Sequence, residues 1–107
     1  TKESWAVQRE DGSWLLDGLI PIVEFKDRLG IKAVPEEEKG RYHTLSGMVM
    51  WLLGRLPNTG DIATWENWRF EVIDLDGKRI DKVLATQLPE PAPETIVESE
   101  SRAPLQD

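Results

Sequence analysis

The sequence predicts an α+β domain with the element order β-β-α-α-β-β-β, in which two helices pack on one face of a mainly antiparallel sheet. Three observations predict this fold class. Strand-like alternation occurs toward both ends of residues 5–88, two segments with helical periodicity lie between, and the dipeptide Asp-Gly marks turns at residues 11–12 and 76–77. Strands grouped apart from helices are typical of α+β folds.

Five segments are predicted as strands: residues 5–9, 13–17, 61–65, 68–75 and 78–88. Asp-Gly at residues 11–12 and at 76–77 supplies the positive φ that a tight hairpin needs. The alternation in WRFEV, residues 68–72, indicates a strand with one buried face. Alternation breaks between Ile80 and Val83, which predicts a β-bulge in the last strand.

The first helix is predicted at residues 21–29, PIVEFKDRL. Pro21 suits a first helical turn, and Gly30 suits the C-terminal end. The apolar residues Ile22, Phe25 and Leu29 recur at helical spacing and define one face. Residues 34–43 follow as a polar connector.

The second helix is predicted at residues 44–56, TLSGMVMWLLGRL. At about 100° per residue, six apolar side chains fall within an arc of about 140°: Leu45, Met48, Val49, Leu52, Leu53 and Leu56. Thr44 is the predicted N-cap, and Pro57 is predicted to end the helix because it restricts the residue before it. Trp51 lies outside the arc, so we expect it to be exposed or covered by something outside this core.

Residues 90–107, EPAPETIVESESRAPLQD, differ in composition from residues 1–89 and form a predicted acidic, proline-rich tail. They hold five acidic residues and one arginine, a net charge of −4, and their three prolines exclude a long helix. Ile96-Val97 is the apolar pair available for docking, and we expect the tail to lie along a partner chain. Since the sequence begins at Thr1 without methionine, we also expect a piece of a longer protein.

Composition excludes several classes of function. The formal net charge of −7 argues against a nucleic-acid surface, which needs clustered cations. The absence of cysteine excludes disulfides and thiolate metal sites and fits a reducing compartment, and His43, the single histidine, cannot build a zinc site. The apolar run at residues 45–54 is far shorter than the roughly 20 residues that cross a bilayer.

Candidate sites are few. Arg55, Asn58 and Gly60 could offer a guanidinium and backbone N–H groups to an anion, but a helix end followed by a turn is the preferred explanation. Asp74 and Asp76 resemble part of a calcium loop but lack its other ligands, and a hairpin turn accounts for them.

Glu36-Glu37-Glu38 is predicted as a solvated loop, with a weak Mg²⁺ contact as the alternative. Trp51 and Trp65 are the predicted interaction residues, because exposed aromatic side chains mark contact surfaces. No combination of residues suggests a catalytic site: Ser46 lies inside a predicted helix, without the sharp turn that a hydrolase nucleophile needs.

Several blocks in order resemble one known family. DGSWLLDGLIPIVEFKDRLGI, TLSGMVMWLLGRLPNTGD and WRFEVIDLDGKRIDKV are similar to the CorC/HlyC transporter-associated domain over about residues 5–86. The most specific pieces are Asp17-Gly18, Thr44-x-x-Gly47, Leu53-Gly54-Arg55-x-Pro57, Phe70-Glu71-Val72 and Asp76-Gly77-x-Arg79-Ile80. Trp51, Trp65 and the acidic tail are not hallmarks of the family.

The resemblance implies a non-enzymatic accessory domain at the cytosolic C-terminus of a bacterial inner-membrane ion transporter or hemolysin. It implies neighbouring CBS domains and a membrane domain in the same protein, and modulation of magnesium or cobalt efflux through contacts with them. It implies no catalytic residues and no cofactor. Because the family is grouped in fold with FAD-binding domains, a sensor for FAD or an adenine nucleotide is the alternative. A homo-oligomer formed through the tail or Trp51 is also possible.

Overall fold

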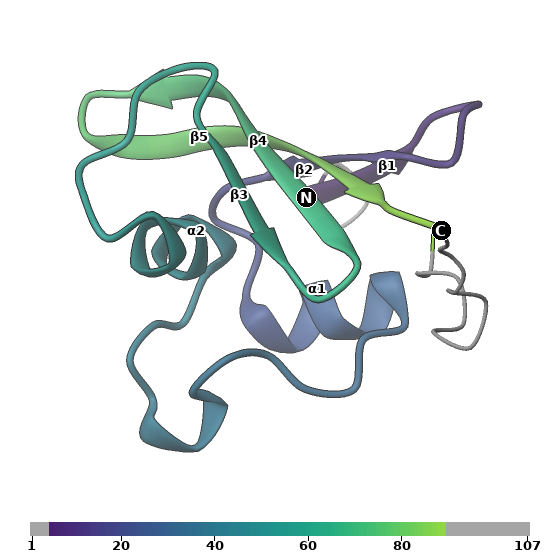
Figure 1. The fold of residues 1–107 in the computed structure, drawn as a ribbon, viewed down its shortest axis with the longest axis horizontal. Helices are drawn as coiled ribbons and strands as arrows, with labels where there is room; N and C mark the ends of the chain where they lie inside the picture. The colour runs from purple at the N-terminus through teal and green to yellow at the C-terminus, as the bar shows by residue number, and fades with distance from the viewer. Residues whose placement is uncertain (1–4, 90–107) are drawn as a thin grey trace, which may run out of the picture.

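The computed structural model describes residues 5–89, so the predicted tail at residues 90–107 and the expectation about its partner lie outside the described residues. A five-stranded antiparallel sheet has the strand order β1-β2-β5-β4-β3, and helices α1 and α2 lie beneath one of its faces (Figure 1). The predicted fold class and element order are therefore confirmed. The elements are β1 Ala6–Gln8, β2 Trp14–Asp17, α1 Ile22–Leu29, the 3-10 turn η2 Glu37–Lys39, α2 Leu45–Leu53, β3 Ile62–Trp65, β4 Trp68–Asp76 and β5 Arg79–Gln87.

The core lies between the sheet and the two helices. Its fully buried side chains include Phe25 of α1, Met48 and Val49 of α2, and Phe70 of β4. The rings of Phe25 and Phe70 lie 6.0 Å apart, so α1 packs directly on the sheet. The strands supply inward residues at every second position, as the alternation predicts.

Helix α1 ends where the sequence predicts and begins one residue later than predicted, at Ile22. Pro21, with φ −63°, is the N-cap residue, and Gly30 ends the helix in the left-handed region with φ 70°. Ile22 and Phe25 are buried, and Leu29 is partly buried against the core.

Helix α2 is shorter than predicted, and its predicted end was wrong. Gly54, with φ 72°, turns the chain into the left-handed region, and its N–H donates to the carbonyl of Met50 at 2.9 Å. The helix therefore stops before Pro57 can act. The helical periodicity does not extend to Leu56, which is 63% exposed instead of joining the apolar face. The N-cap is confirmed, because the Thr44 hydroxyl accepts from the Gly47 N–H.

The strand irregularity is confirmed and involves both long strands. Pairing passes from Val72–Val83 to Asp74–Lys82 and then to Leu75–Ile80, so Ile73 and Asp81 have no direct partner. The turn between these strands is one residue later than predicted: Asp76 pairs with Arg79, and Gly77-Lys78 form its tip.

Candidate functional site

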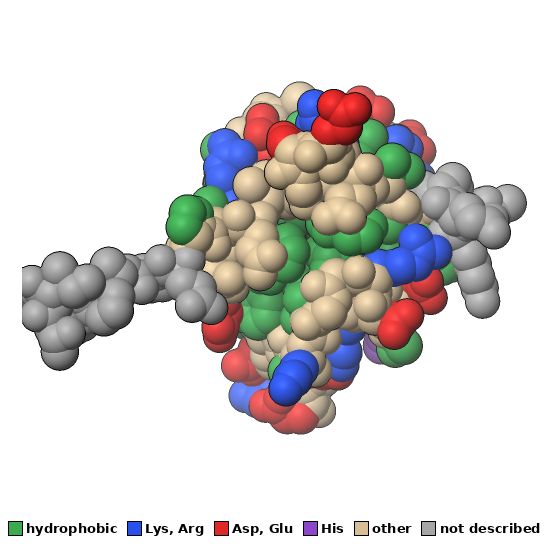
Figure 2. All heavy atoms as spheres, turned by 90° about the vertical axis from the view of Figure 1, so that its right-hand side faces the viewer, with side chains coloured by type: hydrophobic (Ala, Val, Ile, Leu, Met, Phe, Trp, Pro, Cys, Tyr) green, Lys and Arg blue, Asp and Glu red, His purple; other side chains and the backbone are tan. Residues whose placement is uncertain are grey.

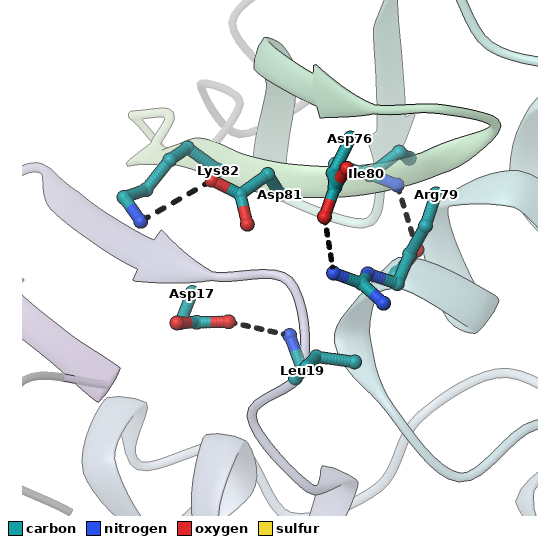
Figure 3. Close-up of polar contacts among 8 residues, drawn as sticks. Asp17, Leu19, Asp76, Arg79, Ile80, Asp81 and Lys82 are labelled. Atoms are coloured by element: carbon teal, nitrogen blue, oxygen red, sulfur yellow. Dashed lines mark hydrogen bonds and ion pairs between the residues drawn. The ribbon is translucent and has the colours of Figure 1, made fainter. Parts of the chain in front are cut away.

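Three of the family motifs meet at one corner, where the end of β2, the start of α2 and the bulge of β5 lie together. Gly18 N–H donates to the carbonyl of Asp81 at 2.9 Å, and Ser46 N–H donates to the carbonyl of Gly18 at 2.8 Å. The Ser46 hydroxyl, 2% exposed, accepts from the backbone N–H of Ile80 at 3.1 Å. Figure 3 shows Asp17 and Leu19 facing the segment of Ile80, Asp81 and Lys82 at this corner. Two backbone hydrogen bonds and one from a backbone N–H to a side-chain hydroxyl thus join three elements.

Gly18 fits this corner because it has no side chain. A Cβ atom at this position would lie 1.9 Å from the carbonyl oxygen of Ile80 and 2.8 Å from its carbonyl carbon. The strand end and the bulge therefore approach more closely than any other residue would allow. The Asp17 carboxylate accepts from the Leu19 N–H at 2.8 Å and fixes the turn that follows.

The predicted anion donors already have partners. The Asp61 carboxylate accepts from Arg55 Nη1 and from the Asn58 N–H, both at 2.7 Å, and Gly60 N–H donates to the carbonyl of Val72 at 2.8 Å. The Arg55 guanidinium and the Asn58 N–H hold the pKa of Asp61 below its usual range. A phosphate or flavin pyrophosphate would have to displace Asp61 from these two donors.

The predicted metal candidates are exposed, and Asp76 lies 2.8 Å from Arg79 Nη2 (Figure 3). Among the acidic connector residues, Glu36 pairs with Lys39, and Glu37 pairs with Lys26 and accepts from the Val34 N–H. Within residues 5–89 no group of three or more His, Asp or Glu side chains is placed to hold a metal ion. A metal site at Asp74 and Asp76 is only the weaker alternative to their role as hairpin residues and stays a prediction.

Trp51 is 41% exposed on α2, as expected, and its ring lies 6.2 Å from that of Tyr42. The side chain of Tyr42 packs on Gly47, which lies one helical turn before Trp51 in α2. The Tyr42 hydroxyl donates to the carbonyl of Pro35. Burial raises the pKa of Tyr42, with smaller contributions from Glu37 and other acidic groups. Trp51 thus covers part of a contact that ties the connector to α2, and its role in self-association stays a prediction.

Trp65 lines a cavity of about 500 Å³ between the connector after α1 and the turn between β3 and β4. One side is lined by residues 29–35, which run from the last residue of α1 into the connector. The other side is lined by residues 65–68, at the turn between β3 and β4, and by Gln87. The end of α1 and the end of β5 lie on the same side of the molecule in Figure 1, and Figure 2 shows hydrophobic side chains gathered at the centre of that side. Glu66 on this wall has φ 55°, a conformation that costs energy for a residue with a side chain.

The sheet face opposite the helices carries an apolar row that sequence reasoning missed. The register places five residues side by side across all five strands: Val7, Leu15, Leu84, Glu71 and Ile62. Their sequence neighbours are buried toward the helices, so this row points away from them. Val7 is 52% and Ile62 46% exposed, while Leu15 and Leu84 are half-buried. We call these five residues the outer row.

A signal for the outer row exists in the sequence. Leu15 and Leu16 are adjacent, as are Val83 and Leu84, so strands β2 and β5 carry aliphatic side chains on both faces. Strands that are apolar on both faces are typical of sheets covered on both faces. The alternation alone could not align these residues, because the row depends on the pairing register of all five strands.

Comparison with known proteins supports the resemblance. The family described as transporter-associated domain, CorC_HlyC, matches residues 7–96. UPF0053 protein sll0260 of Synechocystis is 52% identical over 100 residues, which cover 94% of this chain and 22% of that protein. The polyamine export protein of Haemophilus influenzae is 36% identical over 89 residues, covering 83% of this chain and 20% of that protein. The chain therefore spans about a fifth of the length of these relatives.

Solved structures agree in fold. A transporter-associated domain from a Xylella fastidiosa hemolysin, in complex with Mg²⁺ and Mn²⁺, has a TM-score of 0.68 and 45% identity, covering 79% of this chain and 99% of that one. The transporter-associated domain of a CBS domain protein from Porphyromonas gingivalis has a TM-score of 0.72 and 28% identity, with the same coverages. In the described part of the chain, no helix has the length and apolar character of a membrane span. This chain belongs to the CorC_HlyC family of transporter-associated domains.

Proposed function

We propose that this domain is a non-enzymatic regulatory module of a membrane protein that exports cations. It acts by docking the outer row of its sheet on a neighbouring domain of the same protein. The observation that carries this proposal is the row itself, in which Val7, Leu15, Leu84 and Ile62 are aliphatic and point away from the helices. A solvated antiparallel face normally carries polar residues at such positions.

The chemistry of the row suits a contact surface. Covering an aliphatic side chain fully contributes roughly 1.5–3 kcal/mol, and the partly exposed members of the row would contribute a share of that. Glu71, the polar member, lies 3.4 Å from Arg69 Nη1, so its charge is already paired. Asp17 and Lys82 are paired in the register and place an acidic and a basic side chain beside the row. An apolar centre with a polar rim is the usual anatomy of a protein interface.

The partner that fits best is another domain of the parent protein. The relatives are about five times longer than this chain, and one related domain comes from a CBS domain protein. We therefore propose a CBS domain or the membrane domain as the partner, at the cytoplasmic face of the bacterial inner membrane. The absence of cysteine is consistent with that reducing compartment.

We propose the chemical class of the transported species, which is a polyvalent cation. Relatives at 36–37% identity are named polyamine export proteins, and the Xylella domain was solved with Mg²⁺ and Mn²⁺. Polyamines and these two metal ions are all polyvalent cations. Modulation of magnesium or cobalt efflux, which the family resemblance implies, and modulation of polyamine efflux are the two forms of this proposal.

Cysteine labelling tests the docking step, because this chain has no cysteine of its own. Val7→Cys places a thiol on the outer row, and Val23→Cys places one on α1, at a side chain that is 78% exposed. We expect a maleimide to label Val7→Cys quickly in the isolated chain and at least about tenfold more slowly in the full-length protein. Val23→Cys should label equally in both, with the labelled peptide identified by mass spectrometry. Equal labelling of Val7→Cys in both proteins would rule out docking through this row.

Transport by the full-length protein tests the regulatory step. Leu84→Thr introduces a β-branched side chain, which suits a strand, but replaces an aliphatic group of the row with a polar one. We expect it to change cation export by about fivefold or more, as coupling between sites commonly does. Val23→Thr is the control and should leave export unchanged. If the two variants export alike while both domains remain folded, the regulatory role of the row is refuted.

The alternative function, a sensor for FAD or an adenine nucleotide, stays a prediction. Arg55 and the Asn58 N–H, the predicted donors to an anion, bind Asp61. We therefore expect millimolar FAD or ATP to leave the melting temperature unchanged. A ligand that binds the native state must raise it, so a rise would favour the sensor over the docking module.

A further inference from the structure

The chain leaves strand β5 at the edge of the cavity described above. Gln87, the last residue of β5, lines the cavity, and the next residue, Leu88, donates its N–H to the carbonyl of Asn67 at 2.6 Å. Asn67 belongs to the turn that lines the same side of the cavity as Gln87. The segment that follows residue 89 therefore starts beside the cavity.

The family match extends past this point. It ends at residue 96, whereas β5, the last strand among residues 5–89, ends at Gln87. The family pattern thus continues through residues 90–96. Ile96 closes the match and begins the apolar pair Ile96-Val97 in an otherwise acidic and proline-rich tail. Seven residues beyond residue 89 can span up to about 23 Å, which is enough to reach any wall of the cavity.

The side chains that line the cavity complement those of residues 90–96 in polarity and charge. Leu29, Ile31 and Trp65 are partly buried on its walls and leave apolar surface accessible. Lys32 also lines it, is exposed, and makes no ion pair with any residue between 5 and 89. The tail supplies carboxylates at Glu90 and Glu94 ahead of Ile96.

We propose that residues 90–97 of this chain dock in the cavity, with Ile96 against the apolar wall formed by Trp65 and the connector. This occupant differs from the partner chain that the sequence led us to expect. A tail tethered at the edge of its own cavity has an effective concentration in the millimolar range, which a second copy at micromolar concentration does not match. The proposal is independent of the outer row, which lies on the other face of the sheet.

Disulfide formation between introduced cysteines tests the proposal in the complete 107-residue chain. Ala33→Cys is placed on the exposed connector wall and combined with Thr95→Cys, next to the proposed anchor. The control combines Ala33→Cys with Ser101→Cys, a tail position beyond the family match. We expect the first pair to form an intramolecular disulfide about tenfold faster than the control at micromolar protein concentration.

Two further variants test the anchor. Ile96→Asp in the first pair should abolish its rate advantage, whereas Leu105→Asp, an equivalent change outside the family match, should preserve it. Equal rates for the two cysteine pairs, or an advantage that survives Ile96→Asp, would overturn the proposal. Disulfide-linked dimers as the main product would also overturn it, because they would place the tail on a second copy.

Discussion

Replacing Gly18 with alanine tests whether the corner of family motifs holds the fold together. The alanine Cβ would lie 1.9 Å from the carbonyl oxygen of Ile80, while real Cβ contacts essentially never fall under 3.0 Å. The strand end and the bulge must therefore separate by more than about 1 Å. The obstacle is backbone rather than a flexible side chain, so the clash cannot be relieved by a rotamer change.

The expected cost follows from the bonds that this separation breaks. Gly18 donates to the Asp81 carbonyl at 2.9 Å and accepts from the Ser46 N–H at 2.8 Å. A buried backbone group left without a partner costs about 1–3 kcal/mol, and strain from overpacking adds about 1–3 kcal/mol. We expect Gly18→Ala to lower the free energy of unfolding by about 2–6 kcal/mol, a large part of the roughly 5–15 kcal/mol of a typical domain.

Urea unfolding followed by tryptophan fluorescence or circular dichroism measures this cost, with Gly54→Ala as the matched control. Gly54 also lacks a side chain, but a Cβ there meets no atom within 4 Å. Its φ of 72° should cost about 1–2 kcal/mol. If Gly18→Ala is no more destabilising than Gly54→Ala, then the close approach at the corner does not carry the stability that we assign to it.

Three further changes have expected outcomes in the same unfolding assay. Ser46→Ala removes the acceptor of the buried Ile80 N–H and should cost about 1–3 kcal/mol; a loss under about 0.5 kcal/mol would mean that another acceptor replaces it. Glu66→Gly relieves a positive φ and should stabilise the domain by about 0.5–1 kcal/mol, so a loss of stability would contradict the strain at this turn. Asp61→Asn should lower stability near pH 7, where the carboxylate binds Arg55. Because the folded-state pKa of Asp61 is lowered, its contribution is present above the ordinary pKa of about 4 and is lost as pH falls through the folded value. The stability difference between wild type and Asp61→Asn should therefore shrink below about pH 4; a difference that is constant from pH 7 to pH 2.5 would refute the ion pair.

The sequence predicted those elements whose signals are local. Gly30 and Thr44 mark helix ends through their own backbone and capping preferences, and the structure has them in those roles, while Pro21 lies one residue before the start of α1 as its N-cap. The end of α2 was wrong because two competing stop signals lie close together. Gly54 enters the left-handed region first, so the influence of Pro57 comes too late.

The surfaces with functional potential could not be predicted, because they depend on long-range pairing. The outer row needs the register between β2 and β5, which are far apart in the chain. The cavity brings the connector at residues 29–35 against the turn at residues 65–68, and neither segment carries a recognisable motif. Trp65 was selected only as an exposed aromatic, and its place on the cavity wall comes from the fold.

The motifs that identify the family and the surfaces that we propose for contact are different parts of the molecule. Gly18 and Ser46 are buried and join three elements through hydrogen bonds made by their backbones and by the Ser46 hydroxyl. Such residues specify the fold, and one fold is compatible with more than one function. The outer row and the cavity instead lie on opposite sides of that fold and expose apolar atoms. Differences in activity among relatives that share the corner motifs should therefore map to positions such as Leu84 and Trp65, because these can change chemistry while every bond at the corner remains.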